Sequence, residues 1–180
     1  MHFAITRTRQ IAIRRADFDD AAAIAEVGAV SFGTTYAASS TATDIAVHLE
    51  QFFSPAAVRA AMGVPDCGYL IATIDEKPAG MAKWRHGSAP GAVPESNSIA
   101  LQQLYILPAF QRHGLGYACV DAVAEIGSLR GAHGIWLSVW DHADWAIGFY
   151  RKAGFREVGT TDFRVGETLH TDLLMWSPLR

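Results

Sequence analysis

A six-residue turn, Q-R-H-G-L-G at 111–116, most constrains how this chain can fold. It separates a strand-like run, Ile99 to Leu107, from an amphipathic helical run, Leu115 to Leu129. Because Gly114 and Gly116 lack a Cβ, a pyrophosphate could approach the backbone, and the helix would direct its free N–H groups at the anion. Glycines before a helix are more often ordinary turn residues, so the turn alone indicates a phosphate site only weakly.

A second strand and helix follow this turn. Gly134 to Trp140 is an apolar strand run, and Ala143 to Phe155 reads A-D-W-A-I-G-F-Y-R-K-A-G-F. The order L-Y-I-L-P-x-x-Q-x-x-G-x-G, helix, W-L-x-V-W, helix, F-Y-x-K-x-G-F resembles the acetyl-CoA-binding half of the GCN5-related N-acetyltransferase (GNAT) superfamily. The segments S-F-G-T-T-Y at 31–36 and F-R-V-G-E-T-L-H-T-D-L-L-M at 163–175 are similar to its bacterial PaiA-type polyamine acetyltransferase branch.

Length and composition predict one globular domain. The chain has 180 residues, 50% hydrophobic and 18% charged, so we expect a single domain over 1–180 with its core at 11–176. Apolar runs are too short to span a membrane, and Met1 to Arg9 lacks the apolar stretch of a signal peptide, which predicts a cytoplasmic protein. A net charge of −3 without a basic stripe argues against nucleic acid as a partner.

Cysteine and histidine spacing predicts no metal site. Cys67 and Cys119 lack the spacing of metal ligands and are expected to be free thiols. His113 is separated from His133 and His142 by a whole predicted helix.

Hydrophobic periodicity predicts strands first and then an alternation of strands with helices. The expected strands are Ile11–Arg15, Tyr69–Asp75, Ala79–His86, Ile99–Leu107, Gly134–Trp140 and Leu169–Trp176. The expected helices run from an Asp17 N-cap to about Val30, then over Asp44–Phe53, Pro55–Met62, Leu115–Leu129 and the F-Y segment. The fold class is therefore α/β, with a mixed, mostly antiparallel, twisted sheet and helices on both faces. The resemblance adds a V-shaped opening between the strands that precede the two motifs.

Three segments read as connections. Ser31 to Ser40 is rich in Ser, Thr, Gly and Ala and is expected to be a loop. Glu76-Lys77-Pro78 is expected to turn a hairpin, and Gly87 to Asn97, with two prolines and two glycines, to be a mobile connection.

The resemblance implies that the end of the strand before the turn binds the cosubstrate. Leu104, Tyr105 and Ile106 could be no more than an apolar strand. In the family this strand end splays from its neighbour, and its free backbone groups pair with the pantetheine arm as an added strand would. Pro108, which ends the strand next to the turn, favours this interpretation.

Backbone N–H groups of the turn are expected to hold the pyrophosphate. The side chains of Arg112 and His113 are equally consistent with solvated loop residues, and Gln111 replaces an arginine that is common in the family. The predicted cradle consists of Gln111, Arg112, His113, Gly114, Leu115 and Gly116.

Tyr150 is the residue that the resemblance implies for catalysis. In the family the tyrosine of this F-Y pair points its hydroxyl at the thioester sulfur and acts as general acid for the departing thiolate. A thiol titrates near ~8.5 and a phenol near ~10, so the transfer needs only hydrogen-bond reach. Without the resemblance, Tyr150 would read as a packing residue, as Phe149 beside it still does.

Two departures from the family pattern bear on activity. Ala143 stands where an asparagine usually binds the pantetheine, a bond that Asp144 or a water could replace. Ala100 and Gln102 stand where the PaiA-type pattern carries glutamates that serve the acceptor amine as base or counter-charge. These departures favour a CoA-binding sensor without turnover, whereas Tyr150 and the glycines favour an enzyme.

The general base is left open by the sequence. Asp141, His142 and a chain of waters are the alternatives to the missing glutamates.

The substrate pocket is expected at 31–36, where Phe32 and Tyr36 would contact the acceptor. An ordinary connection between helices explains this segment equally well. The five tryptophans could form a cage for a cationic amine, but core packing accounts better for most of them.

The resemblance implies an enzyme that moves an acetyl group from acetyl-CoA to a small-molecule primary amine by direct attack in a ternary complex. A polyamine is the first acceptor to consider, with Glu167 or Asp172 as counter-charges. An antibiotic, an amino acid and a protein N-terminus are alternatives. The sequence leaves the oligomeric state open, with a homodimer among the options.

Overall fold

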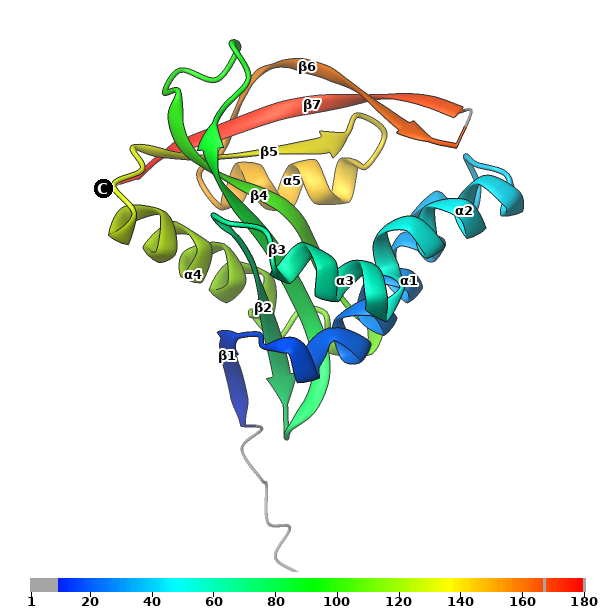
Figure 1. The fold of residues 1–180 in the computed structure, drawn as a ribbon. Coiled ribbons are helices and arrows are strands. Elements are labelled where there is room, and N and C mark those ends of the chain that lie inside the picture. The colour runs from blue at the N-terminus through cyan, green and yellow to red at the C-terminus, as the bar shows by residue number, and fades with distance from the viewer. Residues whose placement is uncertain (1–9, 167, 180) are drawn as a thin grey trace, which may run out of the picture.

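One sheet holds all the strands of the described residues, in the order β1-β2-β3-β4-β5-β7-β6 (Figure 1). The computed structural model describes residues 10–166 and 168–179, so the signal-peptide prediction for Met1 to Arg9 lies outside them. The strands are β1 (Ile11–Arg15), β2 (Cys67–Ile74), β3 (Lys77–Ser88), β4 (Asn97–Ile106), β5 (Gly134–Trp140), β6 (Arg156–Val165) and β7 (Thr168–Pro178). The helices are α1 (Ala21–Tyr36), α2 (Ala42–Phe53), α3 (Pro55–Met62), α4 (Leu115–Leu129) and α5 (Asp144–Lys152).

Helices cover both faces of the sheet, and the predicted α/β fold class is confirmed. Side chains of a strand alternate between the two faces of the sheet, and here each face packs against helices in its own hydrophobic core. Leu70 and Ala72 of β2 pack in the cluster that contains α4 and α5, whereas Tyr69 packs with residues of α1 and α3. Every neighbouring strand pair is antiparallel except β4 with β5, which is parallel.

The prediction of a loop over Ser31 to Ser40 is wrong for 31–36, because α1 continues to Tyr36, and is confirmed for 37–40, which connect α1 to α2. The hydroxyls of Thr34 and Thr35 donate to the carbonyls one turn back, at 2.8 and 2.9 Å, so these polar residues are satisfied within a helix. Asp17 caps a short 3-10 turn that precedes α1, rather than α1 itself.

Two further differences concern strands. β6 was not expected, because its residues do not alternate cleanly, yet it pairs along most of its length with β7. The first hairpin turns at Asp75 and Glu76, which both have left-handed φ angles, 49° and 65°, so that β3 already begins at Lys77.

The two halves of the sheet part between β4 and β5. The two strands pair only over Ser98–Ala100 and Gly134–Trp136, although β4 continues to Ile106 and β5 to Trp140. Pairing of β3 with β4 steps from Lys83–Gln103 to Trp84–Leu101, so Gln102 is an extra residue that bends β4. The predicted V-shaped opening is confirmed. Among the strands that the structure describes, none pairs with the β5-facing edge of β4 at 101–106.

Helix α1 offers a matched test of this packing. A Cβ at Gly28 would lie 2.2 Å from the Phe53 ring, whereas one at Gly33 would meet nothing within 4 Å. Gly28→Ala should therefore lower the free energy of unfolding by about 1–3 kcal/mol, the usual cost of overpacking. Gly33→Ala, in the same helix, should raise it by about 0.5–1 kcal/mol. Urea denaturation measures both; equal effects of the two substitutions would contradict the contact.

Candidate active site

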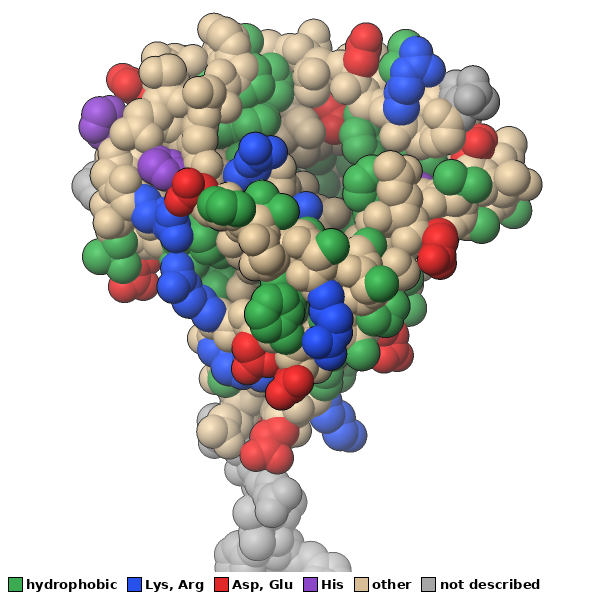
Figure 2. All heavy atoms as spheres, viewed as in Figure 1, with side chains coloured by type: hydrophobic (Ala, Val, Ile, Leu, Met, Phe, Trp, Pro, Cys, Tyr) green, Lys and Arg blue, Asp and Glu red, His purple; other side chains and the backbone are tan. Residues whose placement is uncertain are grey.

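A cavity of about 750 Å³ occupies the opening between β4 and β5. In the space-filling view the upper half of the molecule is hollowed there, with hydrophobic side chains along the recess (Figure 2). Its walls come from α1, β4, β5, α4, α5, β6 and β7, so segments from most of the chain meet at one site.

The glycine turn lies at one end of this cavity. Gly114 is the N-cap of α4 and has a φ of 82°, in the left-handed region that glycine adopts without strain. The Gln111 side chain donates to the carbonyl of Ile106 at 3.2 Å and so ties the turn to the end of β4. The first N–H groups of α4 have no partner inside the helix, and they lie beside a cavity that Arg112 also lines. This end can bind an anion.

Two residues of the turn also make contacts within the protein that the sequence did not indicate. The His113 ring folds back, with its Nδ1 2.8 Å from the carbonyl oxygen of Gln111, and the side chain does not line the cavity. A Cβ at Gly116 would lie 3.1 Å from the Phe149 ring, so this glycine allows α4 and α5 to pack closely as well as lining the cavity.

The end of β4 forms one wall. Leu104, Tyr105 and Ile106 all line the cavity, as do Gln102 and Gln103 before them. The unpaired edge of β4 runs from the turn toward the middle of the opening, where an extended arm could pair with it.

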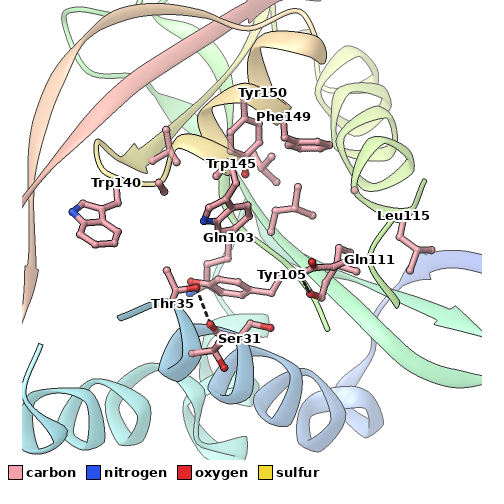
Figure 3. Close-up of a pocket in the computed structure, with 18 of the residues that line it drawn as sticks. Ser31, Thr35, Gln103, Tyr105, Gln111, Leu115, Trp140, Trp145, Phe149 and Tyr150 are labelled. Carbon is pink, nitrogen blue, oxygen red and sulfur yellow. Dashed lines mark hydrogen bonds between the residues drawn. The ribbon is translucent and has the colours of Figure 1, made fainter. Parts of the chain in front are cut away.

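Tyr150 points from α5 into the middle of the cavity (Figure 3). Its ring packs against Phe149 and Phe155, with centroids 5.0 and 5.7 Å apart, and only 9% of the residue is exposed. Burial raises the pKa of the hydroxyl well above its usual value, and nearby Tyr105 adds to the effect. Tyr150 therefore holds its proton more tightly than an exposed phenol does, and its hydroxyl can donate a hydrogen bond into the cavity.

The end of the cavity nearest α1 is aromatic and carries one acid. Tyr36 lines this end of the cavity. Phe32 does not line the cavity: it is buried in the protein, and its ring stacks on the His48 ring with the centroids 4.1 Å apart. Asp172 of β7, which sequence reasoning considered only for a polyamine, lines it and is 4% exposed. Burial raises the pKa of this carboxyl and Asp141 adds to the rise, while a hydrogen bond with Ser138 opposes it.

Several predicted residues do not reach the cavity. Asp144 is exposed in the first turn of α5 and lies outside the lining, whereas Ala143 is buried and belongs to it. Asp141 and His142 contact each other and are also outside. Of the five tryptophans only Trp140 and Trp145 line the cavity, so the five do not form a common cage.

No group of three or more His, Cys, Asp or Glu within 10–166 and 168–179 is placed to hold a metal ion. Among the same residues, no helix is long and apolar enough to cross a membrane.

Comparisons with known proteins agree with this arrangement. The acetyltransferase (GNAT) family profile matches residues 35–155. An uncharacterised N-acetyltransferase of Lactobacillus delbrueckii subsp. lactis, from the pepI 3′ region, is 24% identical over 145 residues, which are 81% of this chain and 84% of that protein.

Solved structures show the same fold. The PaiA N-acetyltransferase of Thermoplasma acidophilum, in complex with coenzyme A, has a TM-score of 0.74 at 20% identity and covers 94% of this chain and 99% of its own. The ribosomal-protein-S18-alanine N-acetyltransferase of Escherichia coli has a TM-score of 0.67 at 18% identity, with 94% of both chains covered. The expected GNAT and PaiA-like resemblance is confirmed, and these likenesses establish the fold.

Gly114→Asp should abolish binding of CoA, because it adds a negative charge and a side chain where the pyrophosphate would lie. Gly131→Asp is the matched control: Gly131 also has a left-handed φ, 76° against 82°, and a Cβ at either glycine would meet no protein atom within 4 Å, but Gly131 is not part of the cavity lining. Calorimetric titration with CoA measures both variants. Equal affinity of Gly114→Asp and the parent would show that the pyrophosphate lies elsewhere.

Proposed function

The chain belongs to the acetyltransferase (GNAT) family, acetyl-CoA-dependent N-acetyltransferases, and from that premise we propose that it acetylates a primary amine by direct attack in a ternary complex. One observation carries the proposal: the opening between β4 and β5 joins a glycine turn before a helix, a strand edge without a neighbour among the described strands, and a buried tyrosine in one cavity. An acceptor that enters from the α1 end would meet the thioester without a covalent enzyme intermediate.

Acetyl-CoA would lie along the wall formed by β4 and α4. Its pyrophosphate would accept hydrogen bonds from the backbone of 111–116, and its pantetheine arm would pair with the edge at Leu104, Tyr105 and Ile106. Ala143 cannot donate a side-chain hydrogen bond to this arm, and Asp144 is not in the lining to replace it, so the strand edge would carry most of the polar contacts.

Tyr150 would protonate the sulfur as the thiolate leaves. Its place in the middle of the cavity supports this role. Backbone N–H groups would stabilise the developing oxyanion. Since cells make acetyl-CoA internally, we also propose that the protein works in the cytoplasm.

Tyr150→Phe should lower kcat by roughly 10²-fold or more, the usual scale of general acid catalysis, and leave CoA affinity unchanged. Tyr69→Phe removes another buried tyrosine hydroxyl, outside this cavity, and should leave kcat near that of the parent. A thiol-release assay with saturating substrates measures both. If the two variants turned over alike, Tyr150 would not be the acid. If the parent released no thiol with any amine, the chain would be a CoA-binding protein without turnover.

The acceptor is a separate question within this function. The resemblance of the segments at 31–36 and 163–175 to PaiA-type polyamine acetyltransferases favours a polyamine. Against it, Asp172 is the one carboxylate among the described lining residues, and Glu167, the other counter-charge considered, lies outside the described residues. A further ammonium of a polyamine would be desolvated beside these walls with no second carboxylate among the described lining residues to pair with it. We therefore propose a primary monoamine ahead of spermidine.

A panel of amines tests this order. An alkyl or arylalkyl monoamine should give a kcat/KM about tenfold or more above that of spermidine, since each unpaired buried ammonium costs at least the ~1.4 kcal/mol that a factor of ten represents. Steady-state thiol release at low salt measures it. A higher kcat/KM for spermidine would instead support a polyamine as the acceptor. In that case the KM for spermidine should rise steeply with salt, whereas the KM for a monoamine should not.

A further inference from the structure

Three side-chain oxygen atoms of this cavity, each from a different residue, are buried and lack a hydrogen-bond partner. They are Ser31 Oγ from α1, Gln103 Oε1 from β4 and Asp172 Oδ1 from β7. The other two such atoms in the described residues are tryptophan nitrogens outside this cavity. Buried polar atoms are nearly always paired in folded proteins, and leaving one unpaired costs about 1–3 kcal/mol. Unpaired oxygens from three separate elements in one cavity indicate a ligand that brings N–H donors.

Asp172 is the charged member of this group. It lies opposite Trp140 in the pairing of β7 with β5, near the end of β5 from which β4 has already diverged. Aromatic rings surround this part of the cavity: the centroid of Tyr36 is 5.6 Å from that of Trp140 and 6.0 Å from that of Phe163, and all three residues line it. A carboxylate among aromatic faces suits a primary ammonium with an apolar body.

We propose that Asp172 binds the ammonium group of the acceptor and removes its first proton before the nitrogen attacks the thioester. The inference rests on the proposed acetyl transfer and assigns to β7 the role that glutamates on β4 would otherwise have. Asp141 and His142, the alternatives from the sequence, lie outside the cavity lining.

The proton balance of the reaction needs two acceptors. One N–H proton passes to the Asp172 carboxylate, and the neutral nitrogen then forms a bond to the thioester carbonyl carbon. The C–S bond breaks, and sulfur takes the proton of the Tyr150 hydroxyl. The second N–H proton leaves as the amide forms and replaces the one that Tyr150 gave up. Asp172 releases its proton to solvent with the product, so the cycle closes.

The surroundings of Asp172 support its function as a base. Tyr36 of α1 and Tyr105 of β4 interact with it electrostatically, Asp141 follows β5, and His170 lies two residues before it on β7. Burial raises the pKa of the Asp172 carboxyl. A higher pKa narrows the gap to an ammonium, whose own pKa is near ~10.4, and so makes the proton transfer less unfavourable.

Asp172→Asn tests the inference through its pH profile. At pH 7 the variant should lose roughly 10²-fold or more in kcat/KM for a cationic amine, the usual scale of base catalysis. The variant can use only amine that is already neutral. Its kcat/KM should therefore approach that of the parent by about tenfold for each pH unit as the pH rises toward the amine pKa. With trifluoroethylamine, which is neutral at pH 7, it should match the parent. The control Asp162→Asn removes an exposed carboxylate from the neighbouring β6 and should keep the parent profile.

Other readouts separate this inference from the function on which it rests. Unchanged CoA affinity shows that Asp172→Asn is folded. Asp172→Ser, which keeps a hydroxyl near Ser138 but also lacks the carboxylate, is a second variant for the same pH profile. In the parent, a primary ammonium should compete with the acceptor at least about tenfold better than an alcohol of the same shape. A parent-like pH profile in either folded variant, or equal inhibition by ammonium and alcohol, overturns the role of Asp172. Absence of acetylation by the parent would instead overturn the proposed function.

Discussion

The parting of β4 from β5 after three residues of parallel pairing is the constraint on which the rest of the site depends. Strands of one sheet normally satisfy each other's backbone groups, so an early separation leaves polar backbone without a strand partner. Here the cost falls on the two facing edges, that of β4 beyond Ala100 and that of β5 beyond Trp136, while β5 remains paired with β7 and β4 with β3. The bulge at Gln102 bends β4 away and makes the separation compatible with continuous pairing on its other side.

Opposite charges stand at the two ends of the resulting cavity. The turn before α4 provides free N–H groups, the positive end of the helix dipole and Arg112, whereas the end nearest α1 provides Asp172. An anionic cosubstrate and a cationic acceptor would each be favoured at one end and disfavoured at the other. The thioester carbon and the acceptor nitrogen would then meet near Tyr150, between the positive and the negative end of the cavity.

Burial prepares two groups for different proton transfers. Removal from water disfavours the charged form of any acid, so it raises the pKa of both the Tyr150 hydroxyl and the Asp172 carboxyl. For the carboxyl this strengthens the conjugate base. For the phenol it makes the proton harder to release, but the same removal from water also disfavours the charged thiolate that would receive that proton. Burial thus strengthens the base directly, whereas it favours transfer from the acid only through its effect on the thiolate.

The local signals of the sequence determined the glycine turn, the flanking β4 and α4, and the aromatic pair on α5, because close backbone approach and helix periodicity are encoded within a few residues. They failed at α1, where side-chain hydroxyls that bond within the helix resemble a polar loop. They also failed at β6, which is a strand only through β7. Asp172 drew attention only as a charge for a polyamine, since one aspartate in an apolar strand carries no motif. Only the tertiary structure decided that it shares a cavity with Tyr150, because burial and the meeting of strands distant in sequence are properties of packing and not of any local pattern.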